Sequence, residues 1–151
     1  MTTPETRAPA PGWYEEKTFV FPIRVYYEDT DLSGVVYHAT YLRFVERGRS
    51  DFLRTTALRH QGMLDVDEPL VWAVCWVTID YIKPARVYEA LEMHTNICNL
   101  SGARLWLSQD IRRQDDILSA AEVEACVISF DGNPRQIPGH MAENLAGFMA
   151  H

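Results

Sequence analysis

Hydrophobic and polar positions follow two different spacings in the first 60 residues of the chain. Between residues 18 and 27, β-branched and aromatic residues dominate and predict a strand. Between residues 39 and 60, the apolar positions recur at helical spacing and predict one long helix. Arg47 and Asp51 lie four residues apart on its polar side, where they can pair. The apolar side of this helix carries Tyr41, Phe44, Val45, Gly48 and Phe52.

From Leu70 onward the pattern favours strands almost to the end of the chain. Residues 70–82 are apolar on both faces, which is typical of a strand that is covered on two sides. Two alternating runs on either side of Asn99–Gly102 predict a hairpin. Asp115–Asp116 then turns the chain into a last strand, and a short helix is expected from about Gly139. The three later strands are expected at residues 87–97, 105–111 and 117–130.

This order of elements predicts an α+β fold in which a curved antiparallel sheet wraps around one long helix. The four consecutive strands are expected to form an antiparallel meander. Residues 1–16 contain several prolines and no periodic apolar face, so a flexible leader is expected there, followed by a single domain at residues 17–151. One helix covers only one face of a sheet, so the second apolar face of residues 70–82 predicts a partner subunit.

Charge and composition narrow the classes of function. The net charge of −7 argues against a nucleic-acid partner, because such binding depends on clustered Lys and Arg. Residues 1–13 lack a cationic segment followed by an apolar stretch, and the longest apolar run, residues 70–77, is too short to cross a bilayer. A cytoplasmic location is therefore expected. No zinc-binding spacing is present, and no metal site is predicted.

Three cysteines lie at wide spacing, each inside an apolar, strand-like run. An odd number of cysteines in such surroundings predicts buried free thiols rather than a disulfide framework. The residues concerned are Cys75, Cys98 and Cys126.

The densest group of polar residues, residues 26–38, stands between the first strand and the long helix. A helix amino terminus carries unpaired N–H groups and a partial positive charge, so it can stabilise a developing oxyanion. Acyl transfer also needs a nucleophile or general base, and Asp29 and Asp31 are the candidates. The alternative is that these residues only make a turn, and that His38 is a packed or capping histidine.

Two neighbouring segments form a recognisable motif: the run from Arg24 to Asp31, and Gly34-Val35-Val36-Tyr37-His38-Ala39 followed by Tyr41-Leu42. With these residues the sequence resembles the Tol-Pal-associated acyl-CoA thioesterases, relatives of 4-hydroxybenzoyl-CoA thioesterase, over roughly residues 18–148. Later segments agree with it: Asp80-Tyr81, Pro84-Ala85-Arg86, Gly102 to Leu107 with Gln109, Ala121-Glu122-Val123, and residues 134–138.

The resemblance implies a hotdog fold in which two subunits join their sheets edge to edge, and in which dimers often pair into a homotetramer. Active sites in that family lie at the dimer interface. The catalytic aspartate then corresponds to Asp31, as nucleophile or as base toward water, and the family histidine to His38, which orients the substrate. Carbonyl polarisation is assigned to a backbone N–H at or next to His38. We expect Val35, Val36, Tyr37 and Tyr41 to contact the substrate.

Three cations are candidates for contacts with the phosphates of CoA: Lys83, Arg86 and Arg104. A solvated surface charge is the alternative for each of them. CoA belongs to the substrate, so no separate cofactor is expected. Glu46 ranks below Asp31 as a base because basic neighbours favour an ion pair there. The aromatic residues of the strands are expected in the core or at a subunit interface, without a chemical role: Trp72, Trp76, Tyr81 and Trp106.

The expected activity is hydrolysis of a small to medium acyl-CoA to free acid and CoA. A non-catalytic acyl-thioester binder, or an assembly protein linked to cell-envelope proteins, is the alternative from another class. The carboxylate of Asp31 favours the enzyme, because an unpaired charge beside a thioester is costly unless it has a function. A hotdog dehydratase needs a His and acid pair that the Asp29–Asp31 segment does not supply.

Overall fold

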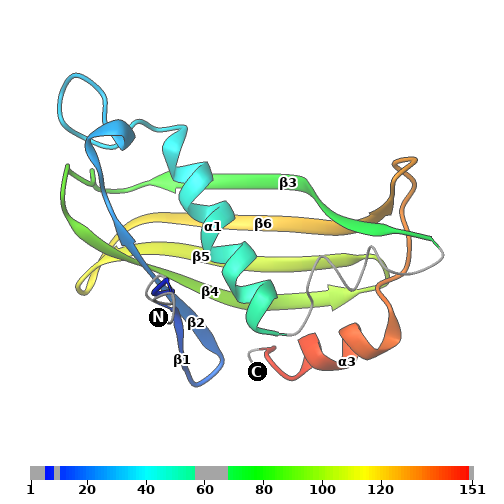
Figure 1. Ribbon diagram of the computed structural model, residues 1–151. Coiled ribbons are helices and arrows are strands. Elements are labelled where there is room, and N and C mark those ends of the chain that lie inside the picture. Colours follow the sequence, from blue (N-terminus) through cyan, green and yellow to red (C-terminus); the bar gives the residue numbers. More distant parts are fainter. Residues whose placement is uncertain (1–5, 9–10, 57–67, 150–151) are drawn as a thin grey trace, which may run out of the picture.

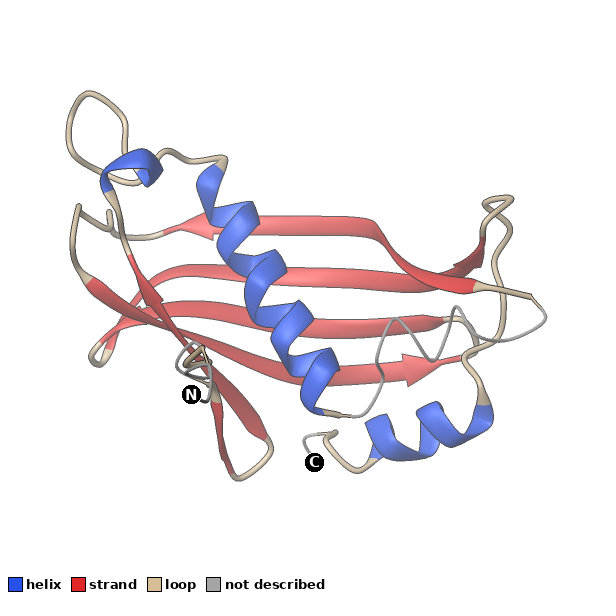
Figure 2. Cartoon of the chain, in the orientation of Figure 1, coloured by secondary structure: helices blue, strands red, loops and turns tan. Residues whose placement is uncertain are grey.

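The computed structural model describes residues 6–8, 11–56 and 68–149. These residues form a six-stranded antiparallel sheet with one long helix lying across one of its faces (Figure 1). Figure 2 shows the same arrangement by secondary structure. In chain order the elements are β1 (Trp13–Glu15), β2 (Thr18–Arg24), the 3-10 helix η1 (Tyr27–Asp29), α1 (Thr40–Thr55), β3 (Leu70–Tyr81), β4 (Ala90–Ser101), β5 (Arg104–Arg113), β6 (Asp116–Ser129) and α3 (Gly139–Ala146).

Helix α1 packs its apolar side onto the sheet, as predicted. Phe44 and Phe52 are completely buried, and each such side chain stabilises the fold by about 1.5–3 kcal/mol. Gly48 permits the close approach, because a Cβ atom there would lie 2.6 Å from the Cγ atom of Met93 on β4. The expected continuation of the helix to residue 60 lies partly outside the described residues, and Thr56 already follows the last helical residue.

The expected four-stranded meander is wrong for β3. The order across the sheet is β1-β2-β4-β5-β6-β3, so β4, β5 and β6 form a meander while β3 pairs with β6 at the edge. The segment after β3 does not make a hairpin turn. Instead, the backbone N–H of Val87 bonds to the carbonyl of Gly34 at 3.2 Å, and that of Tyr88 to the carbonyl of Val25 at 2.7 Å. These bonds hold the connecting segment against residues 25–34, and β4 then pairs with β2 instead of with β3.

Strand β3 lies at the edge of the sheet and is only partly covered. No segment of the described part of the chain covers its second apolar face, and Val74 and Trp76 each keep 47% of their surface exposed. Tyr81 and Ile82, at the end of this strand, are also more than half exposed. A long strand edge with exposed apolar side chains favours pairing with another strand.

Regular structure begins inside the expected leader. Strand β1 pairs with β2 in a register that places Tyr14 opposite Phe19, and their rings lie 5.1 Å apart. The Tyr14 hydroxyl also lies 2.6 Å from the hydroxyl oxygen of Thr55 at the end of α1. The first strand therefore starts before Lys17, where the domain is expected to begin. Within the described ranges, no helix is both long and apolar enough to cross a bilayer.

Candidate active site

The chain leaves β2 through a tight turn that is held by Asp29. The strand expected at residues 18–27 already ends at Arg24, and η1 begins at Tyr27. The carboxylate of Asp29 accepts a 2.8 Å hydrogen bond from the backbone N–H of Tyr26 and is largely buried. For Asp29 the alternative to a catalytic role therefore applies: its carboxylate stabilises the backbone of a turn.

Asp31 lies in the exposed loop that follows. Its carboxylate accepts hydrogen bonds from the backbone N–H of Ser33, at 2.8 Å, and from the Ser33 hydroxyl. The loop is closed by a 2.9 Å bond from the Asp31 N–H to the Val35 carbonyl and by Gly34, whose φ of +80° suits glycine. The Ser33 hydroxyl and then the Ser33 N–H lower the pKa of the Asp31 carboxyl. Asp31 is therefore an ionised, solvent-accessible carboxylate at neutral pH.

The start of α1 presents unpaired backbone donors. Ala39 occupies the position before the first helical residue, and no side chain caps the helix there. The N–H of Thr40 bonds to the Tyr37 carbonyl at 2.9 Å, whereas those of His38 and Ala39 have no partner among the described residues. With the helix dipole they can stabilise negative charge on an oxygen. These two N–H groups are the candidates for the expected oxyanion donor at or next to His38.

The four expected substrate contacts differ in their accessibility. Val36 and Tyr41 are 5% and 3% exposed and belong to the hydrophobic core. The Tyr41 hydroxyl accepts a 3.2 Å bond from the Ala85 N–H, and burial raises the pKa of this tyrosine. Val35 is partly exposed, and Tyr37 is exposed with its ring 4.5 Å from that of His38. Within one chain, Val35 and Tyr37 are the accessible members of the group.

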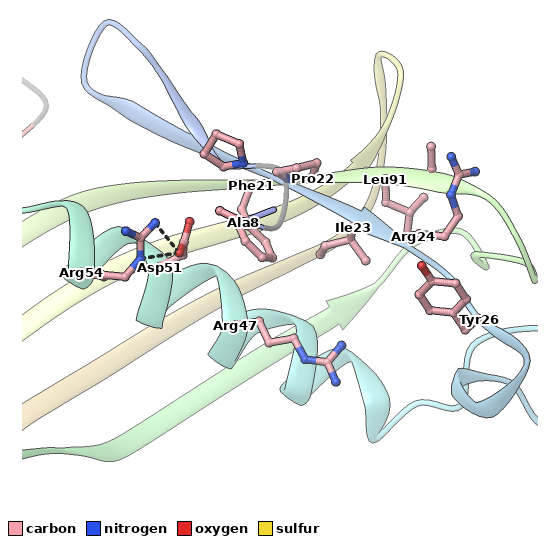
Figure 3. Close-up of a pocket in the computed structure, with 12 residues that line it drawn as sticks. Ala8, Phe21, Pro22, Ile23, Arg24, Tyr26, Arg47, Asp51, Arg54 and Leu91 are labelled. Atoms are coloured by element: carbon pink, nitrogen blue, oxygen red, sulfur yellow. Dashed lines mark hydrogen bonds and ion pairs between the residues drawn. The ribbon is translucent and has the colours of Figure 1, made fainter. Parts of the chain in front are cut away.

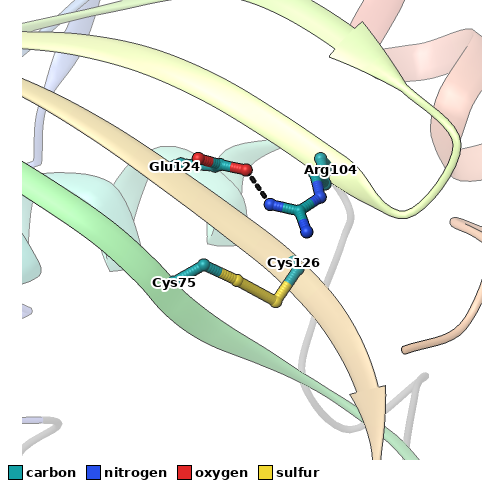
Figure 4. Close-up of a disulfide and its surroundings, with 4 residues drawn as sticks. All are labelled: Cys75, Arg104, Glu124 and Cys126. Atoms are coloured by element: carbon teal, nitrogen blue, oxygen red, sulfur yellow. Dashed lines mark hydrogen bonds and ion pairs between the residues drawn. A yellow bond between two sulfur atoms is a disulfide. The ribbon is translucent and has the colours of Figure 1, made fainter. Parts of the chain in front are cut away.

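The three candidate cations do not meet within one chain. Lys83 bonds to Asp116 at 3.1 Å, beside the β5–β6 turn. Arg104 pairs with Glu124 at the opposite end of β5 (Figure 4). The backbone of Arg86 forms a bridge with Val35, and its exposed side chain has no ion-pair partner in the described part of the chain. Arg86 is therefore the candidate that lies beside the Asp31 loop.

Glu46 is ion-paired, as expected, and its partner is Arg49. The expected pair between Arg47 and Asp51 is wrong, because Asp51 accepts a 2.9 Å bond from Arg54 instead. A pair three residues apart is as favourable on a helix as one four residues apart.

Arg49 belongs to a buried polar network between α1 and the sheet that sequence patterns do not reveal. Its guanidinium donates a 3.3 Å bond to the side-chain oxygen of Gln109, and burial is the main cause that lowers its pKa. The Gln109 amide nitrogen donates to the Val45 carbonyl at 3.0 Å and to the Thr95 hydroxyl at 3.1 Å. This network fixes α1 on strands β4 and β5. The sequence signal for it is weak: Gln109 stands in the alternation of β5 at a position in line with Leu105, Leu107 and Ile111.

Two grooves on the described surface are lined by neither Asp31 nor His38. The larger, of about 780 Å³, lies between α1 and β2 (Figure 3), and we call it the α1–β2 groove. Its lining includes Phe21, Ile23, Arg24, Arg47, Asp51 and Arg54. The smaller, of about 280 Å³, is lined by Trp76 and Trp106 among others.

The cysteines differ from expectation. Cys75 and Cys126 form a disulfide between β3 and β6, with Cα atoms 6.4 Å apart (Figure 4). The register of β3 shifts between Val74 and Trp76, and this bulge leaves Cys75 beside Cys126. Cys98 is a free thiol, but it is exposed. The prediction of three buried free thiols is therefore wrong.

Residues 33–120 match the family model of the thioesterase superfamily. The chain belongs to the thioesterase superfamily. The acyl-CoA thioesterase YbgC of Haemophilus influenzae is 43% identical over 110 residues, which are 72% of this chain and 80% of that protein. The acyl-CoA thioester hydrolase YbgC of Escherichia coli O157:H7 is 39% identical over 122 residues, or 80% of this chain and 90% of that one. A solved structure of a probable thioesterase from Bartonella henselae is 41% identical, covers 80% of this chain and 99% of that one, and has a TM-score of 0.77.

These similarities confirm three predictions. The family is the one that the residues around Asp31 resemble, and the fold is the hotdog fold. The chain is an enzyme that hydrolyses thioesters, which weighs against the non-catalytic binder.

Proposed function

We propose that this protein hydrolyses acyl-CoA thioesters to a free acid and CoA, and that the carboxylate of Asp31 is the central catalytic group. The observation that carries the proposal is that one loop holds an exposed, ionised carboxylate and, where it enters α1 at His38, N–H groups that have no partner among the described residues. The YbgC relatives, named as acyl-CoA thioesterases, support CoA thioesters as the substrate class.

In the proposed reaction the thioester carbonyl oxygen accepts a hydrogen bond from the backbone N–H of His38 or of the adjacent Ala39. Negative charge develops on this oxygen as the carbonyl carbon is attacked, and the helix dipole stabilises it. Asp31 either attacks the carbon, with an acyl-aspartate intermediate that water then hydrolyses, or takes a proton from the attacking water. Both routes release the CoA thiolate, which acquires a proton. The His38 side chain orients the substrate.

A second subunit completes the proposed site. Asp31 lines neither of the two grooves described above, and several apolar side chains around the loop are exposed. We propose a homodimer, or a dimer of dimers, that pairs through the exposed edge of β3. Replacing Trp76, which is 47% exposed on that strand, with Glu is expected to yield monomers in sedimentation measurements. A wild-type protein that is monomeric at micromolar concentration contradicts this part of the proposal.

Arg86 is the proposed contact for the CoA phosphates, because its exposed side chain lies beside the loop and carries an unpaired charge within the described residues. Lys83 and Arg104 are paired with carboxylates in the single chain, and a role for either requires that its partner be released. Arg86→Gln is expected to raise KM for acyl-CoA and to leave KM for a short acyl-pantetheine unchanged. An equal rise for both substrates argues against a phosphate contact.

The main test is release of CoA from short aliphatic, long aliphatic and aromatic acyl-CoAs. Asp31→Asn keeps the side-chain shape and removes the charge, so kcat is expected to fall by about 10²- to 10⁴-fold. Glu28→Gln is the matched control, because Glu28 is an exposed acid in the same segment. Full activity in Asp31→Asn, or an equal loss in both variants, contradicts the role of Asp31. The expected cytoplasmic location and the link to cell-envelope proteins stay predictions.

A further inference from the structure

The α1–β2 groove is separate from the proposed active site. Helix α1 forms one wall and β2 the other, with Arg47 on the helix and Arg24 on the strand (Figure 3). Its volume of about 780 Å³ lies in the range of pockets that hold small molecules, which is about 300–1,000 Å³. Asp31 and His38 do not line it.

The charges along the groove are mainly positive, although the chain as a whole carries −7. Arg54 donates its hydrogen bond to the Oδ1 atom of Asp51, so it is not free to bind a ligand. Arg24 donates one bond, of 2.7 Å, to the Tyr88 carbonyl and keeps its other donors. Arg47 has no hydrogen-bond or ion-pair partner among the described residues. The groove therefore offers one unpaired guanidinium and a second that is partly engaged.

The remaining surface of the groove is apolar. Ile23 and Leu91 present mostly buried side chains, 7% and 2% exposed, and Phe21 is half-buried beside them. Hydrocarbon in contact with these side chains leaves water, which favours binding. An apolar floor next to an unpaired cation fits a ligand that is apolar at one end and anionic at the other.

We propose that the α1–β2 groove binds an alkyl carboxylate, with its charged end on Arg47 and Arg24 and its chain along Phe21, Ile23 and Leu91. An arginine fork matches the two oxygens of a carboxylate. Asp51 lines the same groove, and its Oδ2 atom is buried with no donor in the described part of the chain. A ligand with two negative charges, such as an alkyl phosphate, is repelled more strongly by this carboxylate.

Calorimetric titration of the full-length chain with dodecanoate, below its micellar concentration, tests the proposal. Arg47→Gln is expected to weaken binding by about tenfold, the effect of losing one charge-assisted hydrogen bond. Arg43→Gln is the matched control, because Arg43 is exposed on the same helix and does not line the groove. Dodecanol, which lacks the charge, and dodecyl phosphate, which carries more of it, are both expected to bind more weakly.

The titrations are done in Asp31→Asn protein as well, so that a failure of the proposed hydrolysis leaves the result unaffected. Amide resonances of Phe21, Ile23 and Arg47 are expected to shift on addition of dodecanoate, while those of residues 31–41 stay in place. Absence of binding, equal affinity in Arg47→Gln and wild type, or shifts confined to residues 31–41 overturns the proposal. Tighter binding of dodecyl phosphate than of dodecanoate overturns the carboxylate as the ligand class.

Discussion

The phenol hydroxyl of Tyr81 donates a 2.8 Å hydrogen bond to the backbone carbonyl of His38. This bond ties the end of the edge strand β3 to the segment that presents the unpaired N–H groups before α1. The Tyr81 ring also lies edge-on to that of Tyr41, with centroids 5.2 Å apart. Tyr81, expected to serve only packing, therefore holds the backbone of the proposed oxyanion site and is a positioning residue.

Removing this hydroxyl is expected to impair turnover more than stability. In Tyr81→Phe, the His38 carbonyl loses its partner and the adjacent N–H is less well oriented, so kcat is expected to fall by about tenfold, equivalent to about 1.4 kcal/mol. KM should change little, and the free energy of unfolding should stay within about 0.5 kcal/mol because the side chain is half exposed. Steady-state kinetics and urea unfolding measure both. Tyr88→Phe is the control, since Tyr88 is exposed and lies outside the loop; equal losses in the two variants contradict the positioning role.

Ser33 sets the protonation of Asp31, and its removal should move the pH profile. The Ser33 hydroxyl is the largest cause of the lowered pKa of the Asp31 carboxyl, because it stabilises the charged form. Ser33→Ala should raise this pKa, so the acid limb of kcat/KM against pH should shift to higher pH. Thr30→Val serves as the control, because the Thr30 hydroxyl donates to the Tyr27 carbonyl and not to Asp31. An unchanged acid limb in Ser33→Ala shows that another group governs it.

Local patterns predicted those parts of the fold that depend on neighbours in sequence. The apolar stripe of α1 and the turn at Gly102 are both found, because helical spacing and turn chemistry act within a few residues. The position of β3 at the sheet edge could not be predicted in this way. It goes together with bonds between residues 25–36 and the segment after β3, which lie far apart in sequence and carry no periodic signal.

The same limit applies to the site. A contiguous motif predicts Asp31 and His38 as site residues, and their catalytic roles stay proposals. Tyr81 reaches His38 only through the fold, so its contact leaves no local pattern. The Cys75–Cys126 bond likewise depends on strand register and on a bulge, since the two cysteines are 51 residues apart.

The buried polar network beneath α1 should be needed for stability. In Gln109→Leu, the Arg49 guanidinium loses a buried acceptor and the Thr95 hydroxyl loses a donor. An unsatisfied buried polar group costs about 1–3 kcal/mol, so the free energy of unfolding should fall by about that amount in urea titrations. Gln136→Leu is the matched control, because Gln136 is exposed, and it should stay within about 0.5 kcal/mol of wild type. A Gln109→Leu protein as stable as wild type shows that the network adds no net stability.

The disulfide between β3 and β6 should stabilise the edge of the sheet. Replacing Cys75 and Cys126 with Ser removes a cross-link between residues 51 apart in sequence, which should lower the free energy of unfolding by about 2–4 kcal/mol. Cys98→Ser is the control and should have little effect, because Cys98 is exposed and unbonded. Urea unfolding without reductant measures the difference.

Alkylation of free thiols in living cells tests the same bond together with the expected cytoplasmic location. If the disulfide exists where the protein resides, the denatured and unreduced chain carries one adduct, at Cys98. Three adducts mean that all three cysteines are reduced there, as the thiol chemistry of the cytoplasm favours. In that case the bond is absent where the protein resides, and β3 is held at the sheet edge there by its backbone pairing with β6.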